Sequence, residues 1–96
     1  MSSIAELQAE IAAWIDPLHP ERAPLGIVAK MLAELAELIA SERMSDPLEL
    51  ADVFILALDL ATIQGVDVAA AVRLKLEINR QRTWSIADNG VMQHVD

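Results

Sequence analysis

Four acidic side chains form two pairs whose spacing suits the binding of metal ions. Glu34 and Glu37 are three positions apart in one predicted helix, and Glu49 and Asp52 repeat that spacing in the next. Residues three apart are neighbours on one helix face, so each pair presents two carboxylates together. Carboxylate oxygens are the ligands preferred by hard cations such as Mg²⁺ and Mn²⁺. The spacing therefore predicts a divalent-cation site where the two helices face each other.

The second pair lies in an apolar segment, from Leu48 to Ile63, in which a charge is costly unless it is paired or bound. Asp52 is in mid-helix, which favours a ligand role. Glu49 could instead complete a capping box. Asp59 could pair with a basic residue of the fourth helix or belong to the site. Because the first pair alone is typical of a solvated helix face, the prediction depends on the four carboxylates as a set.

Helices must position these residues, and the sequence predicts four of them. Ala, Leu and Glu dominate the chain, which indicates an all-α fold. Capping signals and glycine place the helices at about residues 4–14, 25–42, 47–64 and 68–82. The two central helices, joined by a short loop, should form an antiparallel hairpin. We expect one domain over residues 1–84 and a short, loose tail over 85–96.

Composition limits the partners of the chain. The 96 residues are 54% hydrophobic, which is more apolar surface than one small core can hide, so a homo-oligomer is expected. The formal net charge of −8 argues against binding nucleic acid or an anionic membrane. We see no signal peptide and no apolar run long enough to span a bilayer. With no cysteine, the sequence fits a cytoplasmic protein.

The fourth predicted helix is the main source of positive charge. It carries four of the seven basic residues, and Lys75, Asn79 and Arg82 share one stripe along it. Such a stripe could contact a polyphosphate, or its charges could simply favour the helix C-terminus. Lys30 lies on the same stripe as Glu34. Trp14 is more typical of a packing residue, and neither histidine has a partner at ligand spacing.

Three blocks of this sequence resemble the MazG-like all-α nucleoside triphosphate pyrophosphatases. The blocks are "KMLAELAEL", "PLELADVFILALDLATIQGVD" and "AVRLKLEINRQRTW". They carry the E-x-x-E, E-x-x-D and K-x-x-x-N-x-x-R motifs of that family in the same order. The match extends over about residues 14–84, most of the chain. Many members have a further glutamate where this chain has Ala33, so Asp59 or a neighbouring subunit could supply a missing ligand.

The resemblance implies a hydrolase that cuts a nucleoside triphosphate between the α and β phosphates, releasing monophosphate and pyrophosphate. It implies Mg²⁺ or Mn²⁺, two or more per site, held by Glu34, Glu37, Glu49 and Asp52. A glutamate would act as the base, and we favour Glu37 over Glu34. It also implies a four-helix MazG-like bundle assembled as a homodimer or homotetramer.

The same resemblance implies where the substrate binds. The expected contacts come from Lys30, Lys75, Asn79 and Arg82, with Trp14 as a wall beside the base. A bacterial or phage enzyme acting on a deoxynucleotide is expected, and a purine such as dGTP or dATP is our preferred guess. The alternatives are a non-catalytic helical oligomer, which would be a regulatory or antitoxin-like binding module, and a bundle whose carboxylates only pair with Lys75 and Arg82.

Overall fold

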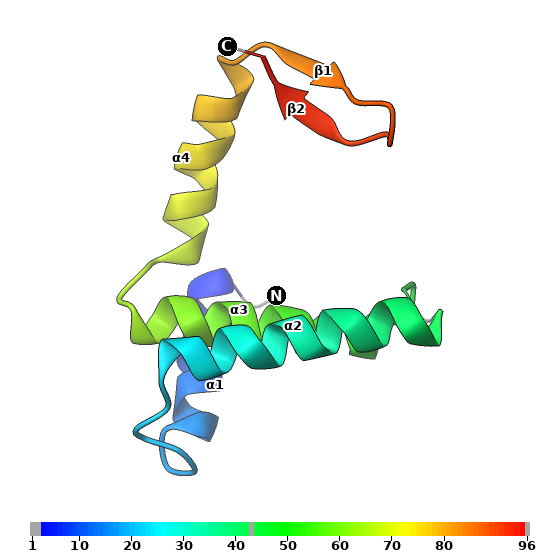
Figure 1. Ribbon diagram of the computed structural model, residues 1–96. Helices are drawn as coiled ribbons and strands as arrows, with labels where there is room; N and C mark the ends of the chain where they lie inside the picture. Colours follow the sequence, from blue (N-terminus) through cyan, green and yellow to red (C-terminus); the bar gives the residue numbers. More distant parts are fainter. Residues whose placement is uncertain (1–2, 43, 96) are drawn as a thin grey trace.

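The computed structural model describes residues 3–42 and 44–95, and within them it has four helices and a β-hairpin (Figure 1). The helices are α1 (Ile4–Ile15), α2 (Pro24–Ser41), α3 (Pro47–Ile63) and α4 (Val68–Arg80). The strands β1 (Trp84–Ile86) and β2 (Met92–His94) follow them. The four predicted helices are therefore confirmed, with ends within about two residues of those expected, the usual scatter of helix boundaries.

Local capping explains where the helices begin and end. The Asp46 side chain accepts from two backbone N–H groups in the first turn of α3, and Asp67 accepts from one in α4. Gly65 adopts a φ of 72°, a left-handed conformation that glycine reaches without strain. Beyond it, the N–H of Val66 donates to the carbonyl of Ala61 at 2.8 Å, which closes the end of α3. The caps at its two ends set the length of α3, which carries two of the four predicted ligands.

The chain packs around α3. Helices α2 and α3 lie side by side as the predicted hairpin, and α1 crosses α3 (Figure 1). Ile27 and Leu38 are the most buried apolar side chains among the described residues. The amide of Gln8 ties α1 to the end of α3, because it donates to Thr62 Oγ1 at 2.9 Å and to the Val66 carbonyl at 3.0 Å. The hairpin and α1 are thus held together as one packed unit.

Helix α4 leaves this unit. It contacts α1 and is bent by 99° relative to α3, so most of it projects away from the hairpin (Figure 1). Within the described residues, no single helix is both long and apolar enough to cross a membrane. Helices α3 and α4 meet that requirement only as a pair, which is broken by this bend.

Much apolar surface is left uncovered in the single chain. Helix α3 is apolar almost all round, but in the single chain most of it is only half-buried, and Leu48 and Phe54 are exposed. The chain exposes 7244 Å², whereas a folded monomer of its mass exposes about 5,400 Å². A single copy covers only the sides of α3 that meet α1 and α2.

The C-terminal tail is more ordered than we predicted. Strands β1 and β2 pair antiparallel with Trp84 opposite His94, and Gly90 takes a φ of 83° in the turn. The Trp84 indole N–H donates to the carbonyl of Asn79 at 2.6 Å, which ties β1 to the end of α4. The expectation of a loose tail missed this hairpin, because the tail is anchored by a tryptophan that we assigned to the helical domain.

Candidate active site

The α2–α3 hairpin brings three carboxylates together. Glu34 of α2 and Glu49 and Asp52 of α3 each offer an oxygen, and these oxygens all lie within 4.8 Å of one another. We call these three residues the acidic cluster. Glu34 and Glu49 are half-buried and Asp52 is exposed, so the cluster opens to solvent on one side. Three oxygen ligands at this spacing suit a hard divalent cation that keeps other positions open for substrate.

Glu37, the fourth predicted ligand, lies outside the acidic cluster. It is exposed on α2, one turn after Glu34. It still acts electrostatically on Lys30, as do Glu34 and Asp52, so it faces the same region of the molecule. The structure thus brings three of the four predicted ligands into one group and places Glu37 at its margin.

Lys30 lies beside the acidic cluster, and its side chain is exposed to solvent. Its Nζ lies 3.0 Å from a carboxylate oxygen of Glu34, one helical turn away. This contact, together with the nearby charges of Glu34, Glu37 and Asp52, raises the pKa of Lys30 above its ordinary value. The ammonium group is therefore fully charged at neutral pH, next to the place where a cation or an anionic substrate would arrive.

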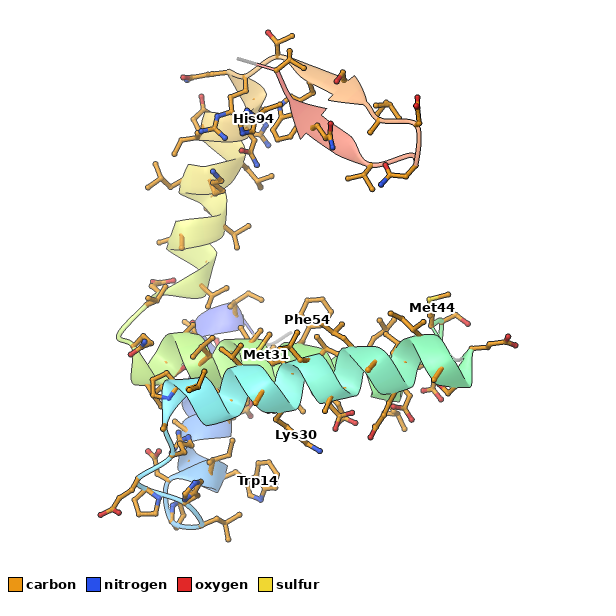
Figure 2. All side chains as sticks on the ribbon, viewed as in Figure 1. Trp14, Lys30, Met31, Met44, Phe54 and His94 are labelled. Atoms are coloured by element: carbon orange, nitrogen blue, oxygen red, sulfur yellow. The ribbon has the colours of Figure 1, made fainter. Side chains whose placement is uncertain are left out.

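A cavity of about 430 Å³ leads from the acidic cluster to α1. Its lining comes from α1, the α1–α2 loop, α2 and α3: Trp14, Ile15, Leu18, His19, Lys30, Glu34, Asp52, Ile55 and Leu56. Figure 2 shows Lys30 projecting from α2 on the side where Trp14 lies. One region of the cavity is charged and the rest is apolar and aromatic, as the phosphates and the base of a nucleotide require.

A larger cavity, of about 780 Å³, lies between α1 and α3. Apart from Glu10, its lining is apolar and includes Leu7, Phe54 and Trp14, and Trp14 also lines the smaller cavity. Such a surface has little to offer a phosphate group. We therefore assign the chemistry to the smaller cavity, which contains the ionised groups.

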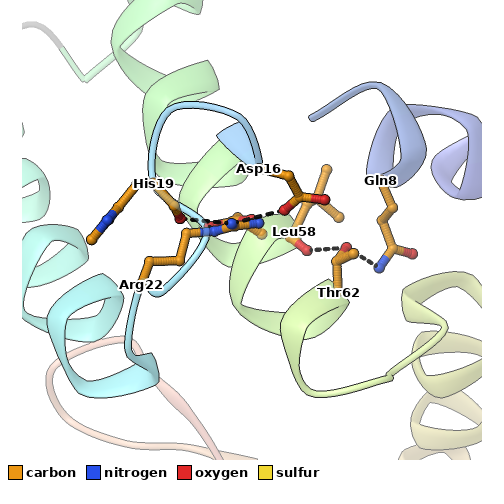
Figure 3. Close-up of polar contacts among 7 residues, drawn as sticks. Gln8, Asp16, His19, Arg22, Leu58 and Thr62 are labelled. Atoms are coloured by element: carbon orange, nitrogen blue, oxygen red, sulfur yellow. Dashed lines mark hydrogen bonds and ion pairs between the residues drawn. The ribbon is translucent and has the colours of Figure 1, made fainter. Parts of the chain in front are cut away.

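Asp59 has a partner that the sequence analysis did not identify. Arg22, in the loop between α1 and α2 (Figure 3), has this role. It donates from Nε to Asp59 Oδ2 at 2.8 Å and from Nη2 to Oδ1 at 2.7 Å. Asp59 is 2% exposed and the Arg22 side chain 6%. The contact raises the pKa of Arg22 further above its already high value. Pairing with a basic residue of the fourth helix, one of the two alternatives for Asp59, is wrong, because α4 turns away from α3.

The signal for Arg22 was present in the sequence but incomplete. A buried aspartate requires a cation, and an arginine is the best partner because its fork matches a carboxylate. Nothing in the local spacing, however, says which of the seven basic residues reaches Asp59. The path of the Pro-rich loop back over α3 decides it, and that path depends on tertiary packing.

The three substrate contacts predicted for the fourth helix are not brought to the acidic cluster within one chain. Lys75 and Asn79 lie on the helix that projects away from the hairpin, and Arg82 follows two residues after its end (Figure 1). Asn79 Oδ1 is buried against its surroundings and has no hydrogen-bond partner within residues 3–42 and 44–95. A buried carbonyl oxygen of this kind calls for a donor that the described chain does not supply.

Comparisons with known proteins bear on the whole chain. A family model described as dATP/dGTP pyrophosphohydrolase matches residues 7–95. A dATP/dGTP diphosphohydrolase of Cyanophage S-2L is 65% identical over 94 residues, which cover 98% of this chain and 90% of that protein. A dATP/dGTP diphosphohydrolase of Salmonella phage PMBT28 is 41% identical over 97% of this chain. This chain spans only 32% of the Salmonella phage protein, which is longer.

One solved structure matches the full length of this chain. It is the MazG-like pyrophosphohydrolase of Cyanophage S-2L, bound to dGDP and three catalytic Mn²⁺ ions per active site. The two folds agree with a TM-score of 0.92 at 64% identity, and each chain is covered completely. The likeness therefore includes the hairpin that carries the acidic cluster, the projecting α4 and the C-terminal strands.

Proposed function

Because this chain belongs to the dATP/dGTP pyrophosphohydrolase family, we propose that it hydrolyses dATP and dGTP to the monophosphate and pyrophosphate. The predicted MazG-like fold and the predicted class of metal-dependent pyrophosphohydrolase are confirmed. A non-catalytic binding module therefore has no observation in its favour. We place the activity in the cytoplasm, where deoxynucleoside triphosphates are found.

The observation that carries this proposal is the convergence of Glu34, Glu49 and Asp52, whose oxygens lie within 4.8 Å of one another. These residues would hold Mg²⁺ or Mn²⁺. When bound, the ions would polarise the phosphoryl group and neutralise its developing charge. We propose two or more ions per site, since the related structure has three and a triphosphate itself supplies further oxygen ligands.

The residues around the acidic cluster then take distinct roles. Glu37 lies one turn from Glu34 and outside the cluster, so its carboxylate is a candidate base that accepts a proton from the attacking water. Bound cations would compete with Lys30 for the carboxylate of Glu34. The ammonium group of Lys30 would then contact phosphate oxygens as a point charge. Glu34 acts chiefly as a ligand in this arrangement, with Glu37 favoured as the base.

The deoxynucleoside would extend from the acidic cluster along the 430 Å³ cavity towards α1. Trp14 and the apolar side chains there offer a flat, apolar surface to a purine ring. The position of Trp14 in this lining agrees with its predicted role as a wall beside the base. Selection between purine and pyrimidine would thus depend on α1 and the loop that follows it.

A second copy of the chain would complete the site. The chain exposes 7244 Å², about 1,800 Å² more than expected for its mass. Burial of an area of this size on each partner is typical of obligate interfaces. Helix α4 projects away from the hairpin and carries Lys75 and Asn79, and Arg82 follows directly after it (Figure 1). We propose a homodimer or homotetramer in which these residues contact the substrate bound by another subunit.

A nucleotide panel tests the proposal directly. The purified protein is incubated with each dNTP and NTP in Mg²⁺ or Mn²⁺, and the products are separated by chromatography. We expect dAMP or dGMP together with pyrophosphate. Diphosphate and phosphate would contradict the position of cleavage, and no turnover of any nucleotide would contradict the activity. Sedimentation of the same sample measures the oligomeric state, and a monomer would contradict the shared site.

A further inference from the structure

Arg22 connects three parts of the chain through one guanidinium group (Figure 3). Its Nη1 forms an ion pair with Asp16 at 2.8 Å and donates to the carbonyl of His19 at 3.1 Å. Its Nε and Nη2 donate to the carboxylate of Asp59 on α3 at 2.7 to 3.1 Å. Such a fork fixes orientation as well as charge. The guanidinium therefore fixes the start of the α1–α2 loop, its middle and its position on α3.

The loop that Arg22 fixes is a wall of the proposed substrate cavity. Leu18 and His19 line the 430 Å³ cavity that contains Glu34 and Asp52. His19 also lines a smaller cavity, of about 300 Å³, together with Arg22 and Asp59. The two cavities share Ile15, His19, Lys30 and Leu56. The buried ion pair thus adjoins the substrate cavity without belonging to the acidic cluster.

We infer that Arg22 is a positioning residue for the nucleotide. Its network with Asp59, Asp16 and the His19 carbonyl holds residues 16–23 in the shape that lines the cavity near the base. This inference rests on the proposed function, because it assigns the wall of that same site. A wall of this kind binds substrate and transition state alike. Its loss should therefore raise KM and leave kcat nearly unchanged.

The variant must release the loop without unfolding the protein. Removing one charge alone would leave the other buried without a partner, which is strongly destabilising. The double variant Arg22→Met with Asp59→Leu removes both charges, and such apolar replacements of a buried ion pair are often neutral for stability. It also removes the bonds to Asp16 and the His19 carbonyl. The loop then loses its anchor while α3 keeps an apolar neighbour.

Gln8 provides the matched control. Its amide is also buried and also joins α1 to distant residues, Thr62, Val66 and Val68, but it lines neither cavity. Gln8→Ala therefore removes a buried polar link between α1 and the end of α3, and it leaves the contacts of the α1–α2 loop in place. Thermal melts of both variants identify any loss of stability, so that kinetic effects can be compared at equal folded fraction.

Two measurements decide the matter. Steady-state kinetics with dGTP and Mn²⁺ should show KM raised about tenfold in the double variant, with kcat changed less than about twofold and Gln8→Ala like the native protein. Hydrogen exchange should be faster in residues 16–23 of the double variant alone. Faster exchange with an unchanged KM would overturn the inference, as would a lower kcat at unchanged KM or an equal rise of KM in Gln8→Ala. A native protein that turns over no nucleotide overturns the proposed function instead, and does so before any variant is made.

Discussion

Asp52 and Asp59 are two helical turns apart on the same side of α3, and the fold treats them in opposite ways. Asp59 is 2% exposed, and the fork of Arg22 contacts both of its oxygens. Asp52 is exposed, belongs to the acidic cluster, and forms no hydrogen bond or ion pair with any residue that the structure describes. One carboxylate is neutralised by the protein itself, and the other is one that we propose binds an external cation.

This difference separates structural acid groups from functional ones. A buried charge must have its partner in the folded chain, because no ligand is present when the core forms. A ligand carboxylate must instead keep an open coordination position and accept repulsion from its neighbours until a cation arrives. For these two aspartates, the pairing therefore indicates the role better than the spacing does.

The largest effect is expected from Asp59→Asn. The variant leaves Arg22 buried without its counter-charge, and breaking a buried ion pair in this way costs about 3–5 kcal/mol. Urea or thermal unfolding followed by circular dichroism measures the loss. A variant as stable as the native protein would contradict the structural role of this pair. Asp88→Asn, an exposed acid between β1 and β2, is a suitable control and should change stability little.

Asp52→Asn should do the reverse, with activity lost and the fold kept. We expect turnover to fall at least about a hundredfold, the scale on which metal sites respond to altered ligands or their supports. Because Asp52 is exposed, the free energy of unfolding should change by no more than about 0.5 kcal/mol. Rates and circular dichroism are measured on the same sample. Full activity would remove Asp52 from the site.

Cation binding should stabilise the native protein through the acidic cluster. At ten times the Kd, Mn²⁺ should add about 1.4 kcal/mol to the free energy of unfolding. Melting curves with and without Mn²⁺ measure this shift, and Glu49→Gln should reduce it. If the melting temperature is unchanged by Mn²⁺ in the native protein, the carboxylates are held together by ion pairs alone.

Lys30→Gln should have the smallest effect, and it has two parts of opposite sign. Without the ammonium, the acidic cluster becomes more negative and should bind Mn²⁺ several-fold more tightly. At saturating Mn²⁺, KM for dGTP should rise several-fold, because a phosphate contact is lost. In the metal-free protein Glu34 raises the pKa of Lys30, so the change in Mn²⁺ affinity should persist at pH 7 to 9 and disappear only as the pH rises through that pKa. An unchanged KM would mean that Lys30 only balances charge.

The local features of this protein could be predicted from its sequence. Caps such as Asp46 and Asp67, and the glycine at position 65, mark helix ends because they act on backbone groups within a few residues. The pairs Glu34 with Glu37 and Glu49 with Asp52 could be placed on helix faces because a helix has a fixed period. The family motifs then indicated the chemistry, which the comparisons support.

Only the tertiary structure decided which of these residues meet. It put Glu34 with Glu49 and Asp52, left Glu37 at the margin, and turned α4 by 99° away from the hairpin. It also brought Arg22 to Asp59, 37 positions along the chain. Such contacts depend on loop paths and helix crossing angles, which are set by packing across the whole molecule and not by any local period. The sequence alone therefore determined the helices and the types of side chain on their faces, and the fold determined their partners.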